Sequence, residues 1–78
     1  MPTYFFNVFN DEITMDQEGA ELPDLQAAHD YAVRAARSLA ADTVMKGFLT
    51  GHHYIEIVDE SREPLATVRF DEAIDIRP

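Results

Sequence analysis

The first part of the chain alternates between apolar and polar residues in the manner of a β-hairpin. Residues 3–9 (TYFFNVF) are aromatic or β-favouring and predict a strand. Asn10-Asp11 suits a turn, because both residues tolerate left-handed backbone geometry. Residues 12–16 (EITMD) alternate again, with Ile13 and Met15 on one side. We therefore predict a hairpin over about residues 3–16.

A helix is predicted next, over about residues 25–46. Asp24 is the expected N-cap, because its carboxylate can accept hydrogen bonds from the free amides of the first turn. Gly47 suits the position after the C-cap. The mostly alanine stripe at helical spacing lets the helix approach a sheet closely, although it buries little area per turn. Its members are Leu25, Ala28, Ala32, Ala35, Ala36 and Leu39.

A second region of alternation predicts another hairpin, over about residues 53–70. YIEIV gives the third strand with Ile55 and Ile57 facing the core, ESREP the turn, and LATVRF the fourth strand. In the tail, residues 71–78, Ile74 and Ile76 stand two positions apart. This spacing indicates either a short fifth strand or a packed tail.

The predicted fold class is therefore α+β, in the order β-β-α-β-β. An antiparallel four-stranded sheet with one helix on one face is the simplest packing of these elements. The length of 78 residues leaves room for one domain, residues 1–78, with one core.

A single helix covers only one side of a sheet, so five large side chains are expected to lie wholly or partly exposed on the other side. Clustered exposed aromatic residues are typical of an interface. Self-association is the simplest use of such a surface, and a domain this small gains stability from it. The tail or the 47–51 loop could instead fold over these residues, which are Phe5, Phe9, Tyr54, Val58 and Leu65.

Composition and charge restrict the partners. The net charge is −9, and residues 1–33 carry seven acids with no lysine or arginine. Nucleic acids and anionic membranes are disfavoured as partners, because binding to phosphates needs a basic surface. The acidic first part, including Asp16 and Glu18, either is simply solvated or docks on a basic protein.

Targeting signals and catalytic motifs do not stand out in the sequence. The chain has no cysteine and no apolar run long enough to span a membrane, and its start does not read as a signal peptide. A cytoplasmic location is the expectation. We expect neither an enzyme nor a cofactor. The only credible metal ligands are His29 and His53, and whether they meet depends on packing that the sequence leaves open.

Three stretches carry a resemblance to a known family: YFFNV, EGAELPDLQAAHDYAVRAARSLAAD and YIEIVDESREPLATVRF. Together they resemble a family of small bacterial proteins that is classed only as a domain of unknown function. The resemblance covers residues 4–70 and implies the same two hairpins and helix, without any catalytic residue. FNDE at residues 9–12 departs from it, because a more polar, glycine-containing turn is expected there.

A weaker resemblance, over residues 4–39, is to HicB-type antitoxin domains. They also place an aromatic hairpin and a PDL-like segment before an alanine-rich helix, and this resemblance implies an acidic protein that neutralises a basic toxin. The sequence as a whole predicts a non-catalytic protein-interaction module that acts as a homodimer. An antitoxin-like partner of a basic protein and a small-ligand or metal-binding module are the alternatives.

Overall fold

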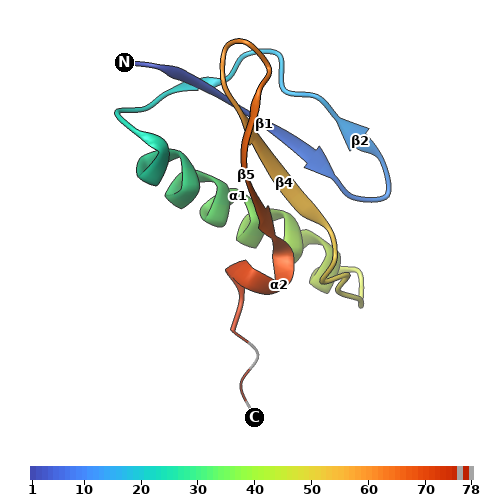
Figure 1. Ribbon diagram of the computed structural model, residues 1–78. Helices are drawn as coiled ribbons and strands as arrows, with labels where there is room; N and C mark the ends of the chain where they lie inside the picture. The colour runs from blue at the N-terminus through green and yellow to red at the C-terminus, as the bar shows by residue number, and fades with distance from the viewer. Residues whose placement is uncertain (76, 78) are drawn as a thin grey trace.

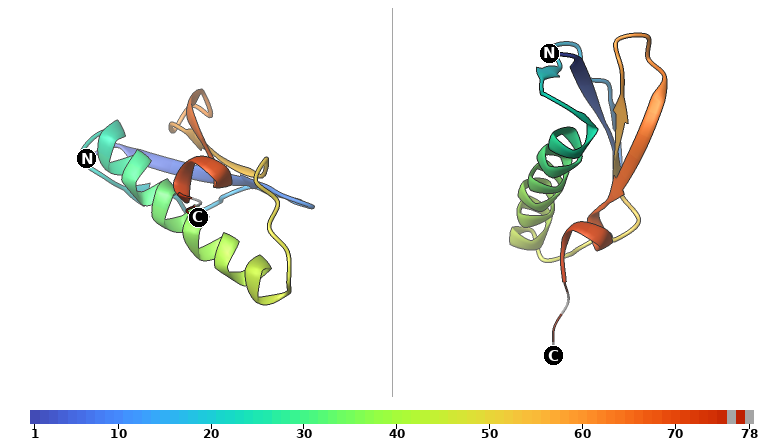
Figure 2. Two further views of the ribbon diagram at one scale, coloured as in Figure 1. Left: turned by 90° about the horizontal axis from the view of Figure 1, so that it is seen from below. Right: turned by 60° about the vertical axis from the view of Figure 1, so that its left-hand side comes forward.

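The computed structural model describes residues 1–75 and 77, and these form one antiparallel sheet and two helices (Figure 1). The strands lie side by side in the order β2-β1-β4-β5, and β3 pairs with β1. The long helix α1 packs along one face of this sheet, and no helix of the described residues lies on the other face (Figure 2). The predicted α+β fold is confirmed. The elements are β1 (Thr3–Phe9), β2 (Ile13–Thr14), β3 (Ala20–Glu21), α1 (Leu25–Met45), β4 (Tyr54–Val58), β5 (Pro64–Arg69) and α2 (Phe70–Ala73).

Three segments differ from the prediction. The returning strand of the first hairpin is reduced to the two residues of β2, and the equally short β3 pairs further along β1. Phe70 does not end the fourth strand but begins α2, where Glu72 accepts a hydrogen bond from the Arg69 backbone N–H. Ile74 lies in no strand, and Ile76 and Pro78, on which the predicted fifth strand also depended, lie outside the described residues.

The core forms where the alanine stripe of α1 meets the sheet. Ala28, Ala32, Ala36 and Ala40 recur every fourth residue and have no exposed surface, so they form one continuous contact line. Against them pack the larger side chains of the sheet and of α2, among them Phe6, Ile55, Ile57, Val68 and Phe70. Leu25 was expected in the stripe but is exposed, whereas Ala40 extends the stripe by one turn.

Both ends of α1 are closed by the residues that the sequence indicates. The Asp24 side chain accepts from the backbone N–H of Ala27 at 2.9 Å. At the other end Gly47 adopts a φ of 98°. The N–H groups of Gly47 and Phe48 donate to the carbonyls of Val44 and Thr43, the bonding pattern of a Schellman motif. The motif turns the chain back toward β4.

The small size of the stripe residues predicts a clear response to enlargement. Ala36→Leu is expected to lower the free energy of unfolding by about 1–3 kcal/mol, because a larger side chain forces the helix away from the sheet. Ala41→Leu, at an exposed position, should change it by less than about 0.5 kcal/mol. Urea unfolding of the two variants gives both values. Equal losses of unfolding free energy in the two variants would contradict a tight contact between Ala36 and the sheet.

Candidate functional site

The face of the sheet that α1 leaves uncovered is called here the helix-free face, and its side chains form three rows across the strands. Phe6, Ile55 and Val68 belong to the core under the helix, so their neighbours along each strand point the other way. Residues directly opposite each other in paired strands share a face. The register gives the rows Ile13–Phe9–Tyr54–Arg69, Asn7–Glu56–Thr67 and Phe5–Val58.

The first row is apolar and open to solvent. Phe9 and Tyr54, two of the predicted interface residues, are half-buried. Their rings stack with centroids 4.8 Å apart and planes 9° from parallel. Ile13 continues the row on β2 and is 66% exposed, and Met15, two residues further along, is also exposed. The apolar surface therefore extends from the two stacked rings to the edge of the sheet.

The second row is polar and already bonded within the chain. Asn7 is almost fully buried. Its Nδ2 donates to Glu56 Oε1 at 3.4 Å, and its Oδ1 accepts from the Asp16 backbone N–H at 2.9 Å. A buried amide with partners on both ends costs much less than an unpaired one. The row therefore separates the two apolar parts of the face without leaving this amide unpaired.

The third row lies at the end of the sheet that carries the β4–β5 turn. Phe5 is half-buried, and the guanidinium carbon of Arg62 stands 4.2 Å from the centre of its ring. Arg62 also reaches the Asp16 carbonyl, to which Nη1 donates at 3.1 Å. Val58, opposite Phe5, is only 2% exposed. The prediction that Val58 is open to solvent is therefore wrong, and this end of the face is occupied by the Phe5 ring opposite Val58 and by Arg62 above that ring.

Leu65 is exposed as predicted, at an irregularity of the sheet. Ile57 pairs with Ala66, whereas Val58 pairs with Pro64, so Leu65 is an extra residue on β5. Such a bulge changes the direction of an edge strand. Leu65 therefore stands at the margin of the helix-free face rather than in one of its rows.

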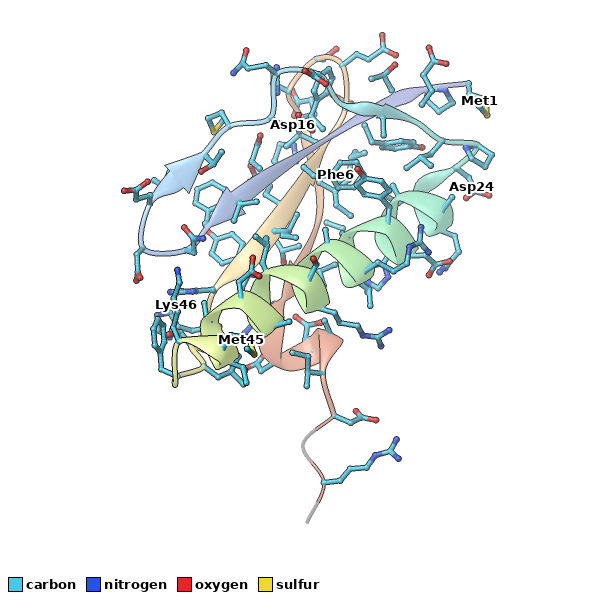
Figure 3. The ribbon with its side chains drawn as sticks, turned by 180° about the vertical axis from the view of Figure 1, so that it is seen from behind. Met1, Phe6, Asp16, Asp24, Met45 and Lys46 are labelled. Atoms are coloured by element: carbon cyan, nitrogen blue, oxygen red, sulfur yellow. The ribbon has the colours of Figure 1, made fainter. Side chains whose placement is uncertain are left out.

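Asp16 organises the edge of β1 in the gap between β2 and β3 (Figure 3). Its Oδ2 accepts from the backbone N–H of Phe6 at 3.1 Å. Its Oδ1 accepts from the N–H groups of Glu18 and Gly19 at 3.1 and 3.2 Å. The carboxylate thus takes the place of a strand partner for Phe6 and at the same time closes a turn.

Gly19 completes this turn at a φ of 70°. A Cβ at this position would lie 2.8 Å from the carbonyl oxygen of Tyr4 and 2.9 Å from Cε1 of Phe5. Only glycine allows the chain to run this close to β1. Of the two acids predicted to dock on a partner, Asp16 therefore bonds to its own backbone, and Glu18 has an exposed side chain.

The two histidines proposed as metal ligands lie far apart. His29 is near the start of α1, whereas His53 lines a hollow together with Thr43, near the end of the helix. The fourteen positions from residue 29 to residue 43 correspond to about 20 Å along a helix. In the described part of the chain, no group of three or more metal-ligating side chains comes together.

A second group of exposed apolar residues escaped the sequence analysis. Val44, Met45, Phe48 and Leu49 lie at the end of α1 and in the loop that follows. Helical periodicity did not mark them, because the Schellman motif interrupts the helix between them. The sequence nevertheless contained a signal, because four large apolar residues within positions 44–49 are more than a solvated helix end usually carries.

An antiparallel sheet with one helix on one face and an apolar row on the other defines a small α+β domain. A family model described as "Domain of unknown function (DUF6894)" matches residues 3–71, and the chain belongs to this family. The match confirms the resemblance to a domain of unknown function. No curated protein and no solved structure matches the chain. Among residues 1–75 and 77, no helix has the length and apolarity needed to cross a membrane.

The two acids allow a direct test of the role of Asp16. Asp16→Ala is expected to lower the free energy of unfolding by about 1–3 kcal/mol, because three backbone N–H groups lose their acceptor. Glu18→Ala, which removes an exposed carboxylate two residues away, should change it by less than about 0.5 kcal/mol. Chemical denaturation measures both. Unchanged stability of Asp16→Ala would show that the Asp16 carboxylate, like that of Glu18, does not stabilise the fold.

Proposed function

We propose that the protein is a non-catalytic protein-interaction module that acts as a homodimer through its helix-free face. The observation that carries the proposal is the open apolar row of Ile13, Phe9 and Tyr54, continued by Met15. Apolar side chains gathered on one face of a small domain are typical of a contact site. The stacked rings offer a rigid surface that loses little side-chain entropy when it is covered.

The charge distribution favours a second copy on this face. The chain has six basic residues and a net charge of −9, so most of its surfaces repel a copy of themselves. Two of the six bases, Arg62 and Arg69, lie on the helix-free face, together with Glu56 of the central row and with Asp71, which pairs with Arg69 at 2.8 Å. These charges balance, whereas the chain as a whole is acidic, so contact through this face adds little repulsion between copies.

The polar row is compatible with burial in such a contact. Asn7 already bonds to Glu56 and to the Asp16 backbone, so covering it leaves no amide group unpaired. Two sheets packed face to face stand about 10 Å apart, with their side chains interleaved between them. The dimer would then have two sheets inside and the two α1 helices outside.

The other two uses of the surface have weaker support. In an antitoxin-like role, Asp16 and Glu18 would meet a basic protein, but the Asp16 carboxylate already holds three backbone N–H groups. In a metal-binding role His29 and His53 would share an ion, but they lie near opposite ends of α1. Self-association uses the apolar row of Ile13, Phe9 and Tyr54, whose side chains are exposed or half-buried.

The dimer proposal predicts the mass in solution and its response to a single charge. Sedimentation at high micromolar concentration should give about twice the chain mass of 8.8 kDa. Ile13→Lys should raise the dissociation constant at least about tenfold, because it places an ammonium group in the apolar row. The added lysine lowers the net negative charge, so general repulsion between copies cannot explain the loss.

Met45→Lys is the matched control, since Met45 is the most exposed large apolar side chain among residues 1–75 and 77 and lies at the end of α1. This variant should leave the dissociation constant unchanged. A mass that stays near 8.8 kDa for the unsubstituted chain would contradict the proposal. So would a dimer that Met45→Lys disrupts and Ile13→Lys leaves intact.

A further inference from the structure

The outer edges of a sheet carry backbone groups that can pair with a strand of another chain. On one side of this sheet, beyond β1, the edge is formed by β2 and β3, which are two residues long each. In the gap between them the Phe6 N–H donates to the Asp16 carboxylate at 3.1 Å. This side therefore presents two short strands and a carboxylate rather than one continuous strand.

The other edge is β5, which is six residues long and lies last in the strand order, next to β4. In an antiparallel pair, the backbone groups of alternate residues point to the partner strand, and those of the residues between them point away. The Phe70 N–H, directly after β5, donates to the His53 carbonyl before β4. The backbone groups of Val68 therefore also point to β4. Those of Thr67 and Arg69 point outward, and both residues are exposed.

One of these outward groups is already bonded within the chain. The Arg69 N–H donates to Glu72 Oε1 at 3.2 Å, so this donor is no longer offered to an added strand. At the other end of β5, Pro64 has no N–H, and the bulge at Leu65 changes the direction of the strand. Thr67 lies between these two blocked ends.

The short helix α2 holds Glu72 in this position. The helix starts directly after β5 (Figure 1), and Ala73 is buried. The Asp71 N–H donates to the Gly51 carbonyl at 3.2 Å. Arg37 Nε donates to the Ala73 carbonyl at 2.6 Å. Since these bonds tie α2 both to the loop before β4 and to α1, the Glu72 carboxylate has a fixed place at the edge of β5.

We propose that the hydrogen bond from the Arg69 N–H to the Glu72 carboxylate prevents β5 from pairing with β5 of a second copy. Without this bond, antiparallel pairing sets Thr67 of each copy opposite Arg69 of the other, and each pair exchanges both of its backbone hydrogen bonds. Two sheets then join edge to edge. The blocked edge is a different surface from the helix-free face, and the proposal does not depend on the homodimer.

The test is made in the Ile13→Lys chain, so that contact through the helix-free face does not mask the result. Adding Glu72→Ala should raise the association constant measured by sedimentation at least about tenfold, because one more N–H in each copy can bond across the edge. Adding Glu72→Gln should leave it unchanged, since this substitution removes the same charge but keeps an oxygen that accepts the Arg69 N–H. No gain with Glu72→Ala, or an equal gain with Glu72→Gln, would overturn the proposal.

Two further measurements locate the contact. Thr67→Pro, added to the Glu72→Ala chain, should return the association constant to that of the Ile13→Lys chain. Proline removes the N–H at the centre of the edge and is tolerated in an edge strand where this N–H faces outward. In the Glu72→Ala chain without proline, the Thr67 amide hydrogen should exchange at least about tenfold more slowly at high than at low protein concentration. Association that survives Thr67→Pro, or that leaves exchange at Thr67 unchanged, would show that the copies meet elsewhere and would contradict the proposal.

Discussion

The contact between the alanine stripe of α1 and the strands β4 and β5 determines most of this structure. Four alanines without exposed surface let the helix lie close to the sheet, and the larger side chains come from the strands and from α2. A helix with such a narrow contact line covers one face and leaves the other to be completed differently. On the helix-free face, Arg62 lies over Phe5 at one end, and Asn7 is hydrogen-bonded within the chain in the middle. The other end is apolar and carries the stacked rings of Phe9 and Tyr54. The interaction surface is a consequence of this one-sided packing.

Acidic residues in the first part of the chain serve several purposes, although their shared charge suggests only one. Asp24 caps α1, and Asp16 supplies the strand partner that Phe6 lacks. Asp11 and Glu12 line the hollow at the end of the helix. Some of the acidic side chains in residues 1–33 therefore bond to the local backbone. Only the other acids of this segment are free to attract a basic partner.

Sequence patterns were sufficient where the determining contacts are local. Asp24 and Gly47 mark the ends of α1 because capping involves residues within one turn. Alternation located β1, β4 and β5 and placed Phe9 and Tyr54 on the same side of the sheet. The remaining features depend on contacts between distant residues. The two-residue β3 exists because Asp16 and Gly19 hold the chain against β1. Arg62 lies over Phe5 because it reaches the distant Asp16 carbonyl. The start of α2 is held by the bond from Asp71 N–H to the Gly51 carbonyl.

The central claim is that two copies meet through the helix-free face, and intermolecular contacts test it most directly. A mixture of isotope-labelled and unlabelled chains allows NOEs between copies to be separated from those within a copy. The account predicts such NOEs from the methyl groups of Ile13 and Met15 to the rings of Phe9 and Tyr54. Intermolecular NOEs confined to Met45, Phe48 and Leu49 would show that the chain associates through the end of α1 and would contradict the account.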